Sequence, residues 1–238
     1  MSTELLLGVI ALCTSAIAGV IGFGGGMLLI AILPAFLSPS LVIPVHGITQ
    51  IASNASRMAF SLSHVQWSLF PKFFVGSLLG ILLFGYVLLS VPHDHVPVAI
   101  GAYILLNLWS PHFARSIRRF ESYYLIGLLQ TGLGLVVGAT GPLSLSVLTK
   151  QLKSKDEIIA TSSMFMTISH LAKIPVFAVI TSALGANLSL IAYMVVGAIL
   201  GSYLGSKLRM VASNDKLILA IKALLTLLAL RMILMAAL

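Results

Sequence analysis

The sequence is poor in charge, in acidic residues and in cysteine. Only 8% of its 238 residues are charged, and six of those residues are acidic. A soluble globular domain carries about 25% charged residues. The single cysteine, Cys13, excludes an intrachain disulfide. Too little polar sequence remains to build a soluble domain, which argues against enzymes and binding modules that work in water.

Signatures of nucleotide and nucleic-acid binding are also missing. The net charge is +8, but the 14 basic residues lie mostly in short segments between apolar runs. They form no basic face on a soluble module, so no nucleic-acid partner is expected. The sequence has no ATP-binding motif, and its glycine-rich stretch lacks the G-x-G-x-x-G spacing. No cofactor and no metal site are predicted.

Apolar runs recur along the whole chain instead, and 59% of the residues are hydrophobic. Runs of about 20 residues match the hydrocarbon thickness of a bilayer. The sequence therefore predicts an all-α, multi-pass membrane protein. The runs cover residues 5–21, 27–37, 67–90, 96–109, 123–137, 187–206 and 217–238.

The second half of the chain repeats the first at an offset of 116 residues. We therefore divide the chain into a first transmembrane repeat (1–110), a basic cytoplasmic linker (111–122) and a second transmembrane repeat (123–238). Beyond residue 57, the spacing of Gly76 and Gly80 recurs at Gly197 and Gly201, after a short insertion in the second half. The ungapped matches are Gly22 with Gly138, Gly25 with Gly141, Ser38 with Ser154, Ser53 with Ser169, and Arg57 with Lys173.

Basic residues divide the connections into two classes. Lys and Arg gather near Lys72 and in the segments 111–122, 150–155 and 207–216, whereas other connections such as 38–43 are poor in charge. Lys and Arg collect on the cytoplasmic side of a membrane protein. Eight simple crossings would place the segments 111–122 and 150–155 on opposite faces, so that topology breaks the rule.

A different topology satisfies the rule. If residues 5–21 and 27–37 form a V-shaped, re-entrant helix pair, and 122–138 and 142–152 form a second, all the basic connections face the cytoplasm. Each half then consists of one glycine-broken V plus three transmembrane helices. Because three is an odd number of crossings, the two halves are inverted repeats, which is a recurrent transporter design. We expect this fold.

Two glycine-rich breaks, Gly22–Gly26 and Gly138–Pro142, interrupt apolar segments at equivalent positions. Unwound backbone inside a membrane is tolerated where it is buried in protein or lines a wet cavity. The helix that restarts after a break offers free N–H groups and a positive dipole end, which suit an anion. The alternative is close helix packing through small residues. The candidate substrate-binding residues are Gly24, Gly25, Gly26, Thr140, Gly141, Pro142 and Leu143.

Two predicted helices, 42–64 and 156–182, carry polar residues on one face. Those residues recur every three or four positions: His46, Gln50, Ser53, Arg57, Ser61 and His64 in the first, and Ser163, Thr167, His170 and Lys173 in the second. Ionisable side chains inside a membrane are costly and mark functional sites; a polar network between helices is the alternative. The candidate substrate-binding residues are Gln50, Ser53, Asn54, Arg57, Thr167, Ser169, His170 and Lys173.

The motifs at the two breaks resemble the sulfite exporter TauE/SafE family of membrane permeases. "GVIGFGGGMLLIAIL" is similar to the opening of that family, and "GLVVGATGPLSL" is a looser second copy, with Ala139 where members commonly have a third glycine. The resemblance covers nearly the whole chain. It implies a plasma-membrane transporter of small, often sulfur-containing anions such as sulfite, thiosulfate or organosulfonates. It implies no catalytic residue.

The leading hypothesis is a secondary transporter that moves a small oxyanion or organosulfonate by alternating access. Arg57 and Lys173 would supply positive charge, because a buried anion is prohibitive without it. Membrane lipid is the other expected partner, the coupling ion is H⁺, Na⁺ or none, and the oligomeric state stays open. An anion channel is the nearest alternative. A binding or assembly protein and an intramembrane enzyme built on Ser144 and His170 are less favoured; the enzyme lacks a G-x-S-x-G elbow.

Overall fold

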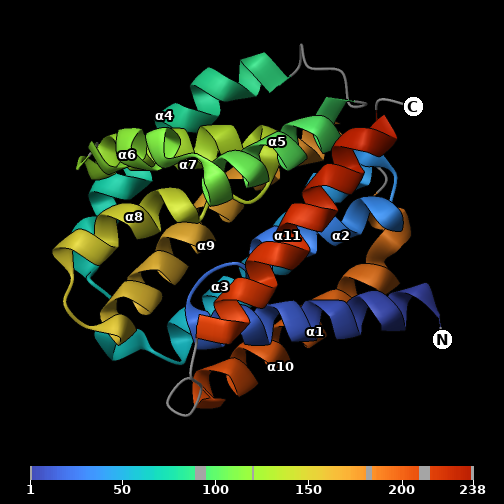
Figure 1. Cartoon of the computed structure of the whole chain (residues 1–238), viewed down its shortest axis with the longest axis horizontal. Coiled ribbons are helices and arrows are strands. Elements are labelled where there is room, and N and C mark those ends of the chain that lie inside the picture. The colour runs from blue at the N-terminus through green and yellow to red at the C-terminus, as the bar shows by residue number, and fades with distance from the viewer. Residues whose placement is uncertain (1, 89–94, 120, 181–183, 209–214, 237–238) are drawn as a thin grey trace.

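The computed structural model is a bundle of helices (Figure 1). It describes residues 2–88, 95–119, 121–180, 184–208 and 215–236, and these ranges contain no strand. The all-α prediction is thus confirmed for the described residues. The helices are α1 (Thr3–Ile21), α2 (Gly25–Ile32), α3 (Pro39–Ala59), α4 (Phe70–Leu88), α5 (Val96–Trp109), α6 (Pro111–Arg119), α7 (Tyr123–Val137), α8 (Pro142–Gln151), α9 (Lys155–Ile180), α10 (Leu188–Leu208) and α11 (Asp215–Ala236).

Four helical stretches of the described residues are long and apolar enough to cross a membrane. They are Thr3–Ile21, Trp67–Tyr86, Gly185–Leu208 and Ile218–Met235. Large apolar side chains on their outer faces, such as Leu82 and Leu227, are more than half exposed, as a lipid-facing surface requires. The chain is therefore a helical membrane protein.

Two segments differ from the predicted helix boundaries. Residues 111–119 of the predicted linker form the helix α6. The polar helix expected over residues 42–64 ends at Ala59, where the Phe60 and Ser61 amides donate to Ser56 and Met58 carbonyls and close the last turn. The next turn, Leu62–His64, is a 3₁₀ helix with His64 exposed, so the prediction that Ser61 and His64 continue the polar face was wrong.

Helices of one half pack against helices of the other through glycine. A Cβ at Gly197 or Gly201 on α10 would collide with the carbonyl oxygens of Gly8 or Leu12 on α1. On α4, the corresponding glycines Gly76 and Gly80 meet the carbonyl oxygens of Tyr124 and Leu128 on α7 in the same way. Tyr124 and Leu128 lie 116 positions after Gly8 and Leu12. The offset found in the sequence thus recurs in the packing of the two helix pairs.

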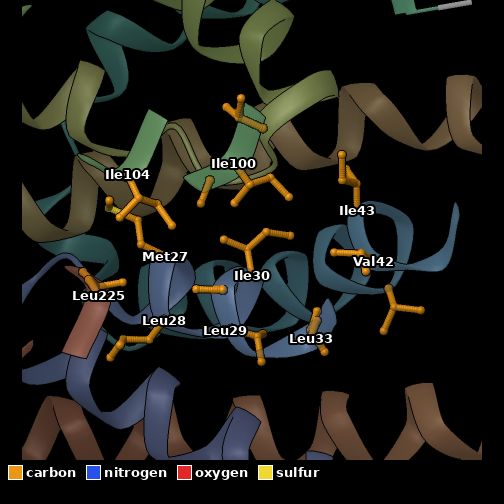
Figure 2. Packing of buried hydrophobic residues seen from close by; sticks show 14 of the residues in the cluster. Met27, Leu28, Leu29, Ile30, Leu33, Val42, Ile43, Ile100, Ile104 and Leu225 are labelled. Carbon is orange, nitrogen blue, oxygen red and sulfur yellow. The ribbon is translucent and has the colours of Figure 1, made fainter. Parts of the chain in front are cut away.

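The short helix α2 is apolar on all sides and lies inside the bundle. Met27, Leu28, Leu29 and Ile30 are buried, and Figure 2 shows them among side chains from three neighbouring helices. A helix that is apolar all round is stable only when it is enclosed. The surrounding residues are Val42 and Ile43 of α3, Ile100 and Ile104 of α5, and Leu225 of α11.

The pair α7–α8 starts and ends at the same place. The Tyr123 hydroxyl, at the start of α7, donates to Gln151 Oε1 at the end of α8 over 2.6 Å. Lys150 forms an ion pair with Glu121 at 3.4 Å. In Figure 1, α6 and the connection from α8 to α9 lie at one end of the molecule, and the two chain termini lie at the other. The basic connections 111–122 and 150–155 therefore share one end.

Candidate functional site

At the first break, only glycine fits the backbone. Gly22 and Gly24 have φ angles of 96° and 89°, in the left-handed region that L side chains rarely adopt. Gly25 opens α2 so close to α1 that a Cβ would collide with the carbonyl of Thr14. No side chain caps α2. The amides of Gly25, Gly26 and Met27 have no hydrogen-bond acceptor among the described residues, so this helix N-terminus keeps free donors.

At the second break, the donors are already used. Gly138 has a φ of 73°, and α8 begins at Pro142, which has no N–H. The Leu143 amide donates to the Thr140 carbonyl at 3.1 Å. The Ser144 amide donates to Gln130 Oε1, also at 3.1 Å. The Thr140 hydroxyl donates to the backbone carbonyl of Gln130 at 2.7 Å. Gln130 and Thr140 thus tie this break to α7.

A cavity lies where both breaks meet the polar helices α3 and α9. Its free space, including its open mouth, is about 450 Å³. It combines apolar walls with a few convergent polar groups, as small-molecule sites do. The lining residues are Ala18, Gly22, Phe23, Gly24, Gly26, Met27, Gln50, Asn54, Arg57, Ala139, Gly141, Pro142, Leu145, Ser162 and Met166.

Arg57 supplies the positive charge of this cavity. Its side chain is only 3% exposed. Nη2 donates to Ser53 Oγ at 2.9 Å and Nη1 donates to Asn54 Oδ1 at 3.2 Å. Asn54 in turn donates to the Gln50 carbonyl and to Gln50 Oε1. A guanidinium held in this way is a rigid, planar set of donors, which suits the oxygens of an oxyanion.

The predicted residues divide between the cavity and its surroundings. Gly24, Gly26, Gln50, Asn54, Arg57, Gly141 and Pro142 line it. Ser53 lies behind Arg57, where its hydroxyl accepts from the guanidinium and pairs with Ser202. The others pack or hydrogen-bond outside the lining: Gly25 against Thr14, Thr140 on Gln130, Leu143 in the core, Thr167 on the Ser163 carbonyl, and Ser169, His170 and Lys173 on α9.

Several lining residues were not predicted from the sequence. Ser162 and Met166 face the cavity from α9, one position before the predicted Ser163 and Thr167. Phe23 and Leu145 add apolar surface. Gln130, which binds the second break, was also missed. A polar residue inside the apolar run 123–137, aligned with Thr14 in the repeat, is the signal that identifies it.

A second cavity continues the first. It shares Phe23, Met27, Pro142 and Leu145 with the first cavity and has a free volume of about 900 Å³, including its open mouth. It extends to Thr149, next to the basic segment 150–155, and is also lined by Asn107 and Lys222. The two cavities together lead from Arg57 toward the basic end of the bundle.

The geometry around Ser144 does not form a nucleophilic pair. The Ser144 hydroxyl donates to the Gly141 carbonyl at 3.2 Å. No hydrogen bond joins Ser144 to His170 in the described ranges, and both ring nitrogens of His170 lack a partner there. The cavity therefore offers hydrogen-bond donors to an anion, and the described contacts do not pair Ser144 with a base.

Comparisons with known proteins bear on the whole chain. The family model described as "Sulfite exporter TauE/SafE" matches residues 7–232. No match is found among curated proteins or among solved structures.

Proposed function

This chain belongs to the sulfite exporter TauE/SafE family of membrane transporters, and from that membership and the cavity we propose that it carries a small sulfur oxyanion or organosulfonate across the plasma membrane. The observation that carries the proposal is the cavity around Arg57, which both glycine breaks and both polar helices line. We propose that the anion binds there and reaches one membrane face at a time.

The chemistry of the cavity supports an anion. Moving an unpaired anion into an apolar interior is prohibitive, and Arg57 compensates that charge permanently because a guanidinium stays protonated. The Asn54 and Gln50 side chains lie beside Arg57. The free amides at the start of α2 add donors at the positive end of a helix dipole. A sulfonate or sulfite presents several oxygens that such donors can share.

We propose that α1–α2 and α7–α8 are the two re-entrant pairs and that the halves are inverted. The lengths of α2 and α8, the second helix of each pair, support this topology. At about 1.5 Å per residue, these helices of 8 and 10 residues fall well short of the membrane core. The shared end of α7 and α8 and the repeated glycine packing of α1 on α10 and α7 on α4 support it further.

The position of the cavity, which Arg57 lines and Lys173 does not, supports alternating access. The cavity continues toward the basic end, which the positive-inside rule assigns to the cytoplasm. Lys173, the counterpart of Arg57, is 1% exposed and His170 beside it is equally buried. In an inverted repeat, Lys173 and His170 have on the external side the place that Arg57 and Asn54 have on the cytoplasmic side. We therefore propose that the structure is the inward-facing state.

Counterflow into proteoliposomes tests the transport proposal. We expect saturable uptake of labelled sulfite, thiosulfate or an alkyl sulfonate against trapped unlabelled anion. Arg57→Gln should lower it roughly 10- to 100-fold, because hydrogen bonds to charged groups contribute about 1.5–3 kcal/mol. The control, Arg115→Gln, changes an exposed arginine on α6 and should leave uptake unchanged. Conduction without counterflow would indicate a channel, and unaltered uptake by Arg57→Gln would refute the binding site.

Cysteine labelling tests the topology. In a Cys13→Ala background, His112→Cys on α6 and Ser154→Cys between α8 and α9 should react with an impermeant maleimide from the cytoplasmic side. Ser40→Cys, at the start of α3, should react from the opposite side. Eight simple crossings would place residues 112 and 154 on different sides, so labelling of that kind would overturn the re-entrant pairs.

A further inference from the structure

Three basic side chains are buried together outside the cavity. His46 of α3 and His170 of α9 lie edge to face, with ring centroids 5.5 Å apart. Lys173 lies one turn after His170 on α9. All three are at most 1% exposed. His46 is nearer the start of α3 and Lys173 nearer the end of α9, which places this basic cluster toward the charge-poor face, on the opposite side from Arg57.

The basic cluster is attached to both glycine breaks. His46 Nε2 donates to the Gly26 carbonyl at 3.0 Å. Lys173 Nζ donates to the Gly138 carbonyl at 3.5 Å. Gly26 itself lines the cavity, and so does Ala139, the residue after Gly138. One bond therefore ends on a residue that lines the proposed anion site, and the other ends on the residue just before one that does.

The remaining nitrogens of the two imidazoles have no hydrogen-bond partner within the described part of the chain. His46 Nδ1 and both ring nitrogens of His170 are buried without a hydrogen bond in the described residues. A buried polar atom without a partner is costly and calls for an explanation. Because His46 Nε2 carries the hydrogen donated to Gly26, its Nδ1 is the acceptor in the neutral ring. The basic cluster thus has open acceptors for a proton.

No described carboxylate balances the cluster. No ion pair joins Lys173 to a described acidic residue. α2 has no ionisable residue, and those of α7, Tyr123 and Tyr124, lie at its far end. On α3 the other charged group is Arg57, in the cavity. The acidic residues of α9, Asp156 and Glu157, lie in its first turn. A proton that enters the cluster therefore adds net positive charge to a buried region.

We propose that His46, His170 and Lys173 form the binding site for a proton that is transported together with the anion. This inference rests on the proposed function. A charge added at low dielectric is costly alone, and an anion in the adjoining cavity offsets it. Proton and anion then strengthen each other's binding, and the linkage is reciprocal. Anion and proton move in the same direction.

The repeat distinguishes His170 and Lys173 from the residues aligned with them in the first half. His170 and Lys173 align with Asn54 and Arg57 at the offset of 116. Asparagine does not titrate and arginine stays charged, whereas histidine changes its charge near physiological pH and a buried lysine can exchange its proton. At these aligned positions the first half thus holds a permanent charge, and the second half holds an exchangeable one.

Proton movement in proteoliposomes tests the proposal. Labelled thiosulfate and an alkyl sulfonate are the probes, because their charge does not change over about pH 6 to 8, where histidine titrates. With wild-type protein, a pH-sensitive dye trapped inside the vesicles should report proton uptake driven by the anion gradient. A pH gradient, acidic outside, should drive anion accumulation. Absence of anion counterflow with the wild-type protein would refute the transport function itself. Normal counterflow without proton movement would refute the proton site alone.

The double variant His170→Asn/Lys173→Arg introduces the residue types of the aligned first-half positions, Asn54 and Arg57. We expect at least about tenfold less proton uptake per transported anion, because the exchangeable groups are gone while the positive charge at position 173 remains. His46→Gln should lower the ratio by itself and decides the test if the double variant does not assemble. Ser163→Ala, at another buried position on α9, is the control and should keep the ratio. Unchanged proton uptake in the cluster variants would overturn the proposal.

Discussion

Among the described residues, the Gly25, Gly26 and Met27 amides of the first glycine break have no acceptor, whereas at the second break the Ser144 amide is bonded to Gln130. Both breaks contain a positive-φ glycine at the aligned positions Gly22 and Gly138, and both restart a helix. Pro142, aligned with Gly26, has no N–H, and the Leu143 amide, aligned with that of Met27, donates to the Thr140 carbonyl. Gln130 aligns with Thr14, whose hydroxyl bonds only to carbonyls of its own helix. Pro142, the Thr140 carbonyl and the Gln130 side chain thus together close the second helix N-terminus.

The largest expected effect separates Gly25 from its counterpart Gly141. Gly25→Ala places a methyl group against the Thr14 carbonyl, and backbone atoms there cannot give way. We expect it to displace α2 and abolish both folded yield and counterflow. At Gly141 the backbone is helical and the nearest atoms belong to the flexible side chain of Met166. Gly141→Ala should cost about 1 kcal/mol, mainly because Pro142 disfavours the helical region for a residue with a Cβ.

Thermal unfolding in detergent and monodisperse yield measure this pair. Gly85→Ala on α4 is a neutral control, because no atom lies within 4 Å of the methyl group that alanine would add there. A Gly25→Ala protein with a wild-type melting temperature would show that α2 does not rest on α1 as described.

An intermediate effect is expected at Gln130, one of the positions that differ between the two breaks. Gln130→Leu removes the acceptor of the Ser144 amide and leaves it buried, which costs about 1–3 kcal/mol. The melting temperature should fall while the anion affinity changes little, because Gln130 does not line the cavity. Thr14→Val, at the aligned position, should shift stability by less than about 0.5 kcal/mol, since its helix carbonyls keep their backbone donors. Equal losses in both variants would contradict the asymmetry.

Much of this arrangement could be predicted from the sequence because its causes are local. The apolar run 123–137 matches α7, and 96–109 matches α5, since runs flanked by polar or proline residues have few alternative ends. Glycine spacing located both breaks. Arg57 was identified because a charge inside an apolar chain is conspicuous.

The rest depends on packing between distant elements. Ser162 and Met166 were missed because α9 carries Thr161, Ser162 and Ser163 in a row, and helical periodicity alone does not tell which of three adjacent polar residues faces the cavity. The link from Gln130 to Ser144 crosses from α7 to α8, so no pattern on either helix contains it. His64 was assigned to a helix that ends at Ala59 because the periodicity continues into the next turn.

The smallest expected effect compares the aligned serines, Ser53 and Ser169. Ser53 Oγ accepts from Arg57 Nη2 at 2.9 Å, and Ser202 donates to the Ser53 carbonyl. Ser169 Oγ is buried without a hydrogen bond in the described residues. Ser53→Ala should lower anion affinity about fivefold, as expected for one hydrogen bond of about 1 kcal/mol, while the dependence on Arg57 remains. Ser169→Ala removes no bond and should change affinity less than about twofold. Titration of each variant with thiosulfate measures both values, and a larger loss at Ser169 would place the anion on the Lys173 side of the breaks.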